Sequence, residues 1–408
     1  MSETIGQRPW MTAPDLSAVL DALEAAGGSD CARFVGGCVR NAVIGRPVDE
    51  IDIATRLTPQ AVTAALQAAK LKAVPTGVEH GTVTAVHAGQ PIEVTTLRRD
   101  VQTDGRRALV AFTTDWGEDA RRRDFTLNSL YARRDGGLYD PTGHGVADAR
   151  AGRIVFVGDP EQRLREDHLR SLRFFRFLAW YGRGEPDAAA LAAIRKLKDQ
   201  VASLAAERIS AELLKLLAAD DPTAAVRLMA ETGVLEVAVP SATDLARFAA
   251  LVATERRRGE ADPLLRLAAL LPDDPAVGLK TAEALRLANA DRDRLAAALT
   301  PAEVGPKVSD HAVRVALYRL GAQRFADRVK LAWARSGDAP QAWSALLAQA
   351  GAWTIPVLPV TGADALDAGA PKGPKVGEAL RALEAWWIAG DFQAGRDEAL
   401  AKLRALVA

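Results

Sequence analysis

Hydrophobic and polar positions repeat in two different ways along this chain, and the change falls near residue 150. Before it, short runs rich in Val, Ile and Thr with a period of two predict strands. These strands are expected at 33–37, 50–54, 81–86, 91–97 and 154–157. Helices are expected between them at 15–26 and 59–70, the second with Thr58 as its N-cap. Strands and helices mixed over roughly 130 residues predict a head with one moderate sheet.

After residue 160, apolar residues recur at helical spacing almost to the last residue, in segments rich in Ala, Leu and Arg. Short breaks containing Asp, Pro or Gly separate these segments. The helices are expected at 161–182, 187–200, 207–218, 222–233, 242–257, 262–271, 280–289, 309–318 and 378–406. The pattern therefore predicts an α+β chain, in which a mixed head is followed by a long helical body.

The composition favours a folded chain of several domains. Of the 408 residues, 49% are hydrophobic and 25% are charged, and these proportions exclude wholesale disorder. No apolar run approaches the ~20 residues that span a bilayer, and the start lacks the basic-then-apolar pattern of a signal peptide. The cysteines are Cys31 and Cys38, which argues for a reducing compartment. We expect a soluble, cytoplasmic protein with no membrane partner.

The charge balance points to no partner by itself. The chain has 52 basic and 52 acidic residues, so its formal net charge is zero. A nucleic-acid binder usually shows a basic footprint, although a local patch is enough. Zero net charge therefore lowers the expectation of a nucleic-acid partner without removing it.

Candidate chemistry is densest between Val35 and Thr55. A Gly36-Gly37 pair between a strand and a helix can present bare N–H groups to a phosphate, and Arg40 can add a charged fork. Glu50 and Asp52, two apart on a strand, would leave the same face and suit Mg²⁺. Taken separately, a glycine pair is usually a tight turn and a strand-end carboxylate a solvated edge. Their occurrence within 16 positions favours a joint phosphate and metal site.

Two arginine clusters follow. Arg121, Arg122 and Arg123 precede Asp124, so they either form a solvated basic turn or aim guanidinium groups at a triphosphate, with Asp124 accepting from a ribose hydroxyl. In the second cluster, Asp167 and Arg170 would share one face of a helix. Arg173 and Arg176 follow on the next turns. The competing interpretation of this cluster is an exposed ion pair between Glu166 and Arg170, worth only ~0.3–0.5 kcal/mol.

These clusters together resemble the motifs of the bacterial class II CCA-adding tRNA nucleotidyltransferase and poly(A) polymerase family. The resemblance covers about 30–220. Its motifs are Gly36-Gly-Cys-Val-Arg, Glu50-Ile-Asp-Ile-Ala-Thr, Arg122-Arg-Asp-Phe-Thr-Leu-Asn, Val157-Gly-Asp-Pro-Glu-Gln-Arg, Glu166-Asp-His-Leu-Arg and Glu207-Arg-Ile-Ser-Ala-Glu-Leu. It implies a polymerase-β-type nucleotidyltransferase head over 1–150, a neck over 151–235 that recognises the nucleotide base and binds RNA, and an elongated helical body and tail over 236–408 that binds tRNA. The implied activity is addition of C, C and A to the 3′ end of tRNA from CTP and ATP, with Mg²⁺ as cofactor.

The resemblance also assigns roles to individual residues. Glu50 and Asp52 would be the catalytic metal ligands, and Asp167 with Arg170 would recognise the incoming base. The residues implied to contact phosphate or ribose, or to support base recognition, are Gly37, Arg40, Arg122, Arg123, Asp124, Arg173 and Arg176. Cytosine and adenine both present an amino donor beside a ring-nitrogen acceptor. A carboxylate next to a guanidinium matches that edge and mismatches uracil and guanine.

Two positions depart from the family pattern, and both lie near the expected catalytic centre. The metal pair is usually Asp-x-Asp, whereas this chain has Glu50 at the first position, directly after Asp49. The family's Val-Arg-Asp is Val-Arg-Asn here, so Asn41 replaces a carboxylate that would orient Arg40. Glu93 is either a third carboxylate near the metal or an exposed strand residue.

Three functions are consistent with these motifs. The first is full CCA addition, and the second is a related output, either poly(A) synthesis or addition of CC or A alone. The segment 96–114 resembles the flexible loop of full CCA-adding enzymes, which counts against a CC-only enzyme. The third is a non-catalytic RNA-binding relative, suggested by Glu50 and Asn41, although the intact base-reading arginines argue against it.

Overall fold

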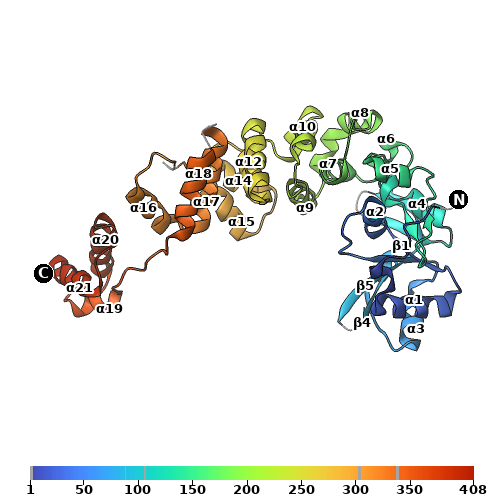
Figure 1. Cartoon of the computed structure of the whole chain (residues 1–408), viewed down its shortest axis with the longest axis horizontal. Coiled ribbons are helices and arrows are strands. Elements are labelled where there is room, and N and C mark those ends of the chain that lie inside the picture. Colours follow the sequence, from blue (N-terminus) through green and yellow to red (C-terminus); the bar gives the residue numbers. More distant parts are fainter. Residues whose placement is uncertain (1–2, 88, 105–106, 302–304, 337–339) are drawn as a thin grey trace. The chain divides into compact units, whose positions relative to one another are not determined.

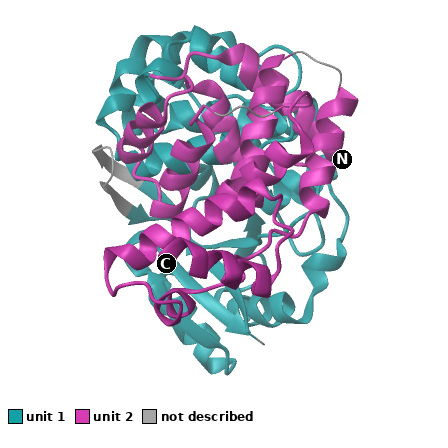
Figure 2. Ribbon diagram, turned by 90° about the vertical axis from the view of Figure 1, so that its left-hand side faces the viewer, with its two compact units in different colours: residues 1–240 teal, residues 241–408 magenta. Residues whose placement is uncertain are grey.

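The computed structural model describes residues 3–87, 89–104, 107–301, 305–336 and 340–408. It divides into two compact units, residues 1–240 and 241–408 (Figures 1 and 2). The first unit contains the sheet and the helices that follow it, and the second is helical. In the described part of the chain, no helix is both long and apolar enough to cross a membrane.

The centre of the first unit is a mixed sheet of seven strands in the order β3-β4-β5-β2-β1-β8-β9. Strands β2 and β5 pair in parallel, and the other neighbours pair antiparallel. A separate two-stranded ribbon, β6–β7, leaves the sheet after β5. The strand bounds are Ala32–Val35 (β1), Asp52–Thr55 (β2), Lys72–Gly77 (β3), Thr82–His87 (β4), Gln90–Thr96 (β5), Arg98–Asp104 (β6), Arg107–Phe112 (β7), Tyr131–Ala132 (β8) and Leu138–Tyr139 (β9).

Helices cover this sheet where the apolar spacing predicts them. The first long helix, α1, buries Leu16, Val19, Leu20 and Leu23, which recur at three- and four-residue spacing and form one face. The predicted N-cap of α3 is confirmed, because the Thr58 hydroxyl accepts the N–H of Ala61. The helices of this part are α1 (Pro14–Gly27), α2 (Gly37–Ile44), α3 (Pro59–Ala68), α4 (Trp116–Arg121) and α5 (Gly145–Ala151), with 3₁₀ turns at Pro9–Thr12, Val78–His80 and Thr126–Asn128.

The helices that complete the first unit pack on a cluster of phenylalanine rings. Phe125 contacts Phe156, Phe174 and Phe177, with ring centroids 5.0, 6.3 and 5.0 Å away. The strand predicted at 154–157 is wrong: Phe156 makes only an isolated bridge to Phe125 and serves as packing. These helices are α6 (Pro160–Glu166), α7 (Arg170–Tyr181), α8 (Ala188–Leu197), α9 (Ala206–Leu217), α10 (Thr223–Glu231) and α11 (Val234–Ala238), with a 3₁₀ turn at Lys198–Ser203.

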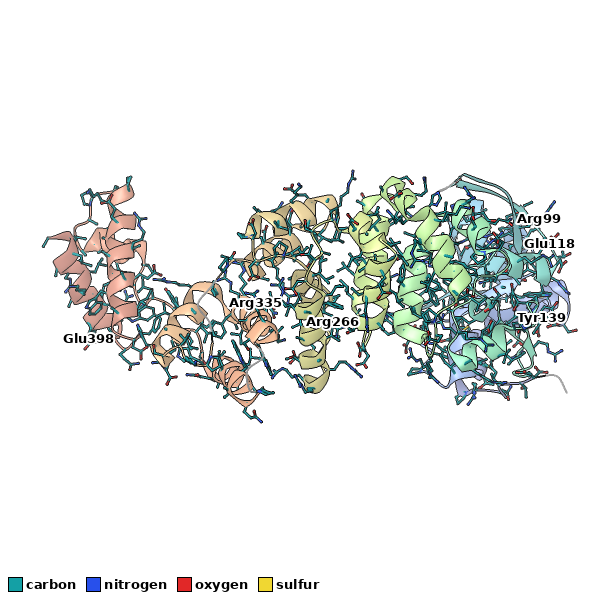
Figure 3. All side chains as sticks on the ribbon, turned by 90° about the horizontal axis from the view of Figure 1, so that it is seen from above. Arg99, Glu118, Tyr139, Arg266, Arg335 and Glu398 are labelled. Carbon is teal, nitrogen blue, oxygen red and sulfur yellow. The ribbon has the colours of Figure 1, made fainter. Side chains whose placement is uncertain are left out.

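The second unit consists of ten described helices. Its first two helices are joined by a buried ion pair, in which Arg266 Nε lies 2.5 Å from Glu255 Oε2 and both side chains are fully buried. Arg266 is labelled in Figure 3. The run predicted at 378–406 is two helices, because Asp391 and Phe392 adopt left-handed backbone conformations between them. The bounds are Leu245–Arg258 (α12), Pro263–Leu270 (α13), Pro275–Ala284 (α14), Asn289–Ala298 (α15), Asp310–Leu320 (α16), Ala322–Ser336 (α17), Pro340–Ala352 (α18), Gly362–Asp367 (α19), Pro374–Ala389 (α20) and Arg396–Val407 (α21).

Candidate active site

A cleft beside the sheet is lined by carboxylates. Asp52 is the first residue of β2, and the parallel register places it beside Glu93 of β5. Together with Asp15, Asp49 and Glu50, these residues line a cleft of about 870 Å³. Among the described residues that line it, none is a lysine or an arginine. The cleft is therefore strongly negative until a cation enters it.

Asp52 is the carboxylate on which this charge acts most clearly. Asp52 is exposed, but desolvation by the walls of the cleft raises its pKa above the usual 3.8. The charges of Glu93 and Glu50 raise it further, while Arg123 acts in the opposite direction. The structure shows no hydrogen bond or ion pair to the Asp52 carboxylate among the described residues. Hard carboxylate oxygens that repel one another fit a divalent cation. Among the described residues, no group of three or more Asp, Glu, His or Cys side chains is arranged to hold a metal ion.

Glu50 does not lie on a strand, so the prediction that it shares a strand face with Asp52 is wrong. β2 begins only at Asp52, where pairing with Val35 of β1 begins. Before that point, the turn at Gly36 removes the β1 partner, and the parallel register places Pro91, which has no N–H, opposite Glu50. Glu50 therefore lies in an exposed loop that still lines the cleft.

The glycine pair forms the turn that the sequence predicts. Gly36 has φ 73° and ψ −122°, a conformation open to glycine, and α2 begins at Gly37. A side chain at Gly36 would approach Arg123, because the Cβ position lies 3.6 Å from Arg123 Nη1. The start of α2 and a guanidinium group thus lie together, an arrangement suited to a phosphate.

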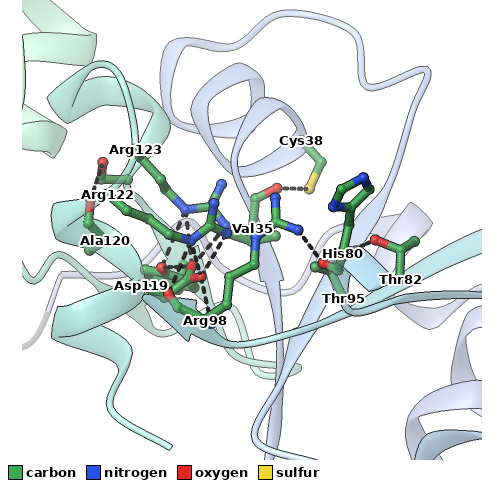
Figure 4. A network of polar contacts seen from close by, with 12 residues as sticks. Val35, Cys38, His80, Thr82, Thr95, Arg98, Asp119, Ala120, Arg122 and Arg123 are labelled. Carbon is green, nitrogen blue, oxygen red and sulfur yellow. Dashed lines mark hydrogen bonds and ion pairs between the residues drawn. The ribbon is translucent and has the colours of Figure 1, made fainter. Parts of the chain in front are cut away.

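Arg122 and Arg123 share one carboxylate, Asp119, which the sequence analysis missed. Asp119 is 1% exposed and lies 2.8 Å from Arg122 Nη2 and 3.0 Å from Arg123 Nη2 (Figure 4). Burial alone would raise its pKa, but Arg123 and Arg122 outweigh burial and hold the pKa far below the usual range. Its spacing of three and four residues before the two arginines was the available signal, but the same pattern is typical of exposed pairs.

Asp124 is buried and already has protein partners. Its Oδ2 accepts from Arg173, with Nε at 2.8 Å, and its Oδ1 accepts from the Phe125 N–H and from Asn128 Nδ2. Burial would raise its pKa, but Arg173 and these hydrogen bonds lower it. A ribose hydroxyl would have to displace one of these donors. The next arginine, Arg176, lies 2.6 Å from Glu212, so both of these α7 arginines have carboxylate partners.

Arg40 is also buried among protein acceptors. It donates to Asn128 at 2.6 Å, to Tyr181 at 2.7 Å and through two N–H groups to Asn41. Four of its five N–H groups are therefore used, and one on Nη1 remains for a phosphate. Asn41 still orients Arg40, and its amide also donates to the Pro47 carbonyl at 2.8 Å, a bond that the family's aspartate could not make.

Asp167 and Arg170 do not share a helix face, so that prediction is wrong. The predicted helix 161–182 breaks at Asp167, which is extended and accepts the N–H of Leu169 at the start of α7. The other Asp167 oxygen accepts from Arg208, at 2.7 Å, a residue to which the sequence analysis gave no role.

The ion pair between Glu166 and Arg170 does form, at 2.6 Å, but with side chains only 15% and 12% exposed. Arg170 also donates to the Arg122 carbonyl at 3.2 Å. The candidate base-recognition group thus contacts the arginine motif of the head directly.

The small mixed sheet thus carries a negative cleft, a glycine turn into a helix and a buried arginine pair. Two family models match this part of the chain. The model of the poly A polymerase head domain matches residues 32–155, and that of the probable RNA and SrmB-binding site of polymerase A matches residues 185–245.

Relatives extend the match over most of the chain. The mitochondrial CCA tRNA nucleotidyltransferase 1 of Mus musculus is 33% identical over 383 residues, covering 91% of this chain and 86% of that protein. The CCA-adding enzyme of Lacticaseibacillus paracasei is 33% identical over 396 residues, covering 93% and 94%. The crystal structure of the Bacillus stearothermophilus CCA-adding enzyme in complex with CTP superposes with a TM-score of 0.76, at 29% identity, covering 93% and 94%. This chain belongs to the family of CCA-adding tRNA nucleotidyltransferases.

These matches confirm the predicted family, its enzyme class and the α+β fold. They place the nucleotidyltransferase head before a helical remainder, as the change of pattern near residue 150 predicts.

Proposed function

We propose that this chain adds C, C and A, without a nucleic-acid template, to the 3′ end of tRNA from CTP and ATP, with release of pyrophosphate. The observation that carries this proposal is the uncompensated carboxylate of Asp52 beside Glu93 and Glu50, close to the turn at Gly36. A relative at 29% identity has been crystallised with CTP, which supports a nucleoside triphosphate as the ligand.

In this mechanism, Asp52 and Glu50 hold the divalent metal, for which Mg²⁺ is our choice, and Glu93 acts as a further acidic neighbour. When bound, the metal lowers the pKa of the tRNA 3′-hydroxyl and offsets the charge of the phosphates. The 3′-oxygen attacks the α-phosphorus of the incoming nucleotide, and the bond to the leaving pyrophosphate breaks. The carboxylates therefore supply positioning and charge rather than a covalent step.

The basic residues are assigned to the triphosphate. The N–H of Gly37 and the guanidinium group of Arg123 orient the phosphates, with Arg122 beside them and one N–H of Arg40 as a further donor. Asp124 holds Arg173 in the free enzyme, and a ribose contact would require exchange of one of its donors. These residues fix the distance between the nucleotide and the carboxylates.

Base selection is assigned to Asp167 and Arg170, with Arg173 and Arg176 in support. An amino group of cytosine or adenine would replace Arg208 at the Asp167 carboxylate, while Arg170 would donate to the neighbouring ring nitrogen. We assign the head to 1–150, the neck to 151–235 and the tRNA-binding body and tail to 236–408. A cytoplasmic location stays a prediction from the sequence.

An extension assay on tRNA that lacks its terminal CCA tests the proposal, with Mg²⁺ and CTP, ATP or both, resolved to single nucleotides. Addition of C, C and A followed by a stop is the expected result. Long A tails would instead identify a poly(A) polymerase, and a stop at CC a partial enzyme. Binding of tRNA without incorporation would contradict catalysis and favour the non-catalytic relative.

A further inference from the structure

We propose that Asp119 is a positioning residue that couples the β6–β7 ribbon to the two arginines of the nucleotide site. The inference rests on the proposed function, which assigns Arg122 and Arg123 to the triphosphate and Arg170 to the base. Asp119 lies on α4. It acts through the groups that it holds.

The Asp119 carboxylate lies where the ribbon and the arginines meet, as Figure 4 shows for Arg98, Arg122 and Arg123. Its Oδ1 accepts the backbone N–H of Arg98 at 3.2 Å and Nε of Arg122 at 2.9 Å. Its Oδ2 accepts Nε and Nη2 of Arg123 at 3.2 and 3.0 Å, and the Tyr131 hydroxyl at 2.6 Å. One buried carboxylate therefore accepts hydrogen bonds from four residues, at three places in the chain.

Arg98 is the residue at which the ribbon begins. Its backbone N–H donates to Asp119, and its carbonyl accepts Nε of Arg122 at 3.1 Å. The backbone N–H and carbonyl of Arg98 are thus both hydrogen-bonded to the ion pair of Asp119 and Arg122. A displacement of the ribbon at its base has to move or break these bonds, and with them the orientation of Arg122.

The coupling continues to the candidate base-recognition group. The carbonyl of Arg122 accepts from Arg170 Nη2 at 3.2 Å. A continuous set of hydrogen bonds consequently runs from the ribbon through Asp119 and Arg122 to Arg170. The position of the ribbon and the form of the nucleotide site are linked by this route.

A purely structural role for Asp119, as a buried counter-ion, makes a different prediction. Asp148 provides the matched comparison, because it is 3% exposed, lies in the same part of the chain and also binds an arginine. Its carboxylate accepts from Arg153 at 2.9 Å and from Thr126 at 2.7 Å, and none of its hydrogen bonds involves the ribbon or the arginine pair. Asp148→Asn therefore reports the cost of removing a buried charge alone.

The experiment compares Asp119→Asn and Asp148→Asn in the full chain. We measure equilibrium binding of CTP, KM for CTP and for tRNA, thermal unfolding and amide hydrogen exchange at β6 and β7. Asp119→Asn is expected to weaken CTP binding and raise KM for CTP about tenfold, to leave KM for tRNA within about twofold, and to speed exchange in the ribbon. Asp148→Asn is expected to lower the unfolding temperature without these changes.

A second variant, Arg122→Lys, tests the same coupling if Asp119→Asn folds poorly. Arg122→Lys retains the positive charge but lacks the Nε–H that reaches the Arg98 carbonyl, and it should also speed exchange in the ribbon. Ribbon exchange and CTP affinity that match those of the Asp148 variant would overturn the coupling. CTP binding and exchange need no tRNA turnover, so failure of the proposed function would be seen separately, as a wild-type chain that adds no nucleotides.

Discussion

Carboxylates in the acidic cleft and in the arginine clusters of the first unit have opposite surroundings. Asp52 lies beside two other carboxylates, its own carboxylate forms no ion pair or hydrogen bond among the described residues, and its pKa is raised. Asp124 lies beside Arg173, accepts hydrogen bonds at both oxygens, and its pKa is lowered. Asp124 is thus neutralised by a protein partner, whereas under the proposed function Asp52 would be neutralised by a metal ion and the substrate.

The largest effect is expected at Asp52, whose carboxylate has no hydrogen bond or ion pair among the described residues. Asp52→Asn should reduce the rate of nucleotide addition at least about 100-fold, since loss of metal-based charge stabilisation is worth several kcal/mol. Its affinity for tRNA should stay nearly unchanged. Single-turnover extension and tRNA binding measure the two quantities, and an equal loss of both would make Asp52 a structural residue.

Although Asp52→Asn should lose activity, it should gain thermal stability. The raised pKa of Asp52 means that its favourable contribution is complete below its usual value of 3.8 and is lost as the pH rises through the folded-state pKa. At neutral pH without divalent metal, Asp52→Asn should therefore unfold at a higher temperature than the wild type. Unfolding in the presence of a chelator, from pH 4 to 8, tests this sign.

Removing Asp124, whose charge is paired with that of Arg173, should mainly destabilise the fold. Asp124→Ala leaves Arg173 without its carboxylate and should lower the free energy of unfolding by about 3 kcal/mol, the usual loss for one partner of a buried pair. The lowered pKa of Asp124 predicts that its contribution is present above 3.8 and lost as the pH falls through the folded-state value. Urea unfolding at several pH values measures it, and a stability equal to that of the wild type would break the comparison.

Base selection should depend on Arg170, which pairs with Glu166 in the free protein. Arg170→Ala is expected to reduce discrimination of C and A against U and G about tenfold, with little change in metal dependence. Because Arg170 also pairs with Glu166, Glu166→Gln provides a control that loosens the ion pair but retains the arginine. If Arg170→Ala keeps its selectivity, the base-recognition role belongs elsewhere.

The smallest effect is expected at Asn41. Asn41→Asp would give Arg40 a charged partner but would lose the donor to the Pro47 carbonyl, worth about 1 kcal/mol. The loop that carries Asp49 and Glu50 should loosen, with a rate lowered a few-fold. Measurement of the Mg²⁺ concentration that gives half-maximal rate tests this. An unchanged value would show that this hydrogen bond does not position the loop.

Much of this molecule could be predicted from sequence because the signals are local. The N-cap Thr58, the glycine turn at Gly36 and the change of period near residue 150 each depend on residues close together in the chain. The strand through Glu50 could not be excluded, since the missing partner at Gly36 and the proline at Pro91 become relevant only once the register is known.

The partners of the site residues were harder to predict, because they come from distant positions. Arg208 reaches Asp167 across 41 residues, and Arg173 reaches Asp124 across 49. Asp119 is close in sequence to its arginines, but its burial decides its importance, and depth does not follow from a charge pattern on one helix. The residue types of the site were therefore predictable, whereas their pairing was not.

The parallel pairing of β2 with β5 has a consequence for folding. Side chains alternate between the two faces of a strand, so a register slipped by one residue would move Glu93 to the face opposite Asp52. The repulsion between these carboxylates acts against the native register, and under the proposed function a bound divalent ion would offset it. Metal binding would then favour the native strand alignment, and the unfolding temperature should rise with metal concentration as mass action requires. The ion that serves the chemistry would also select the correctly aligned sheet.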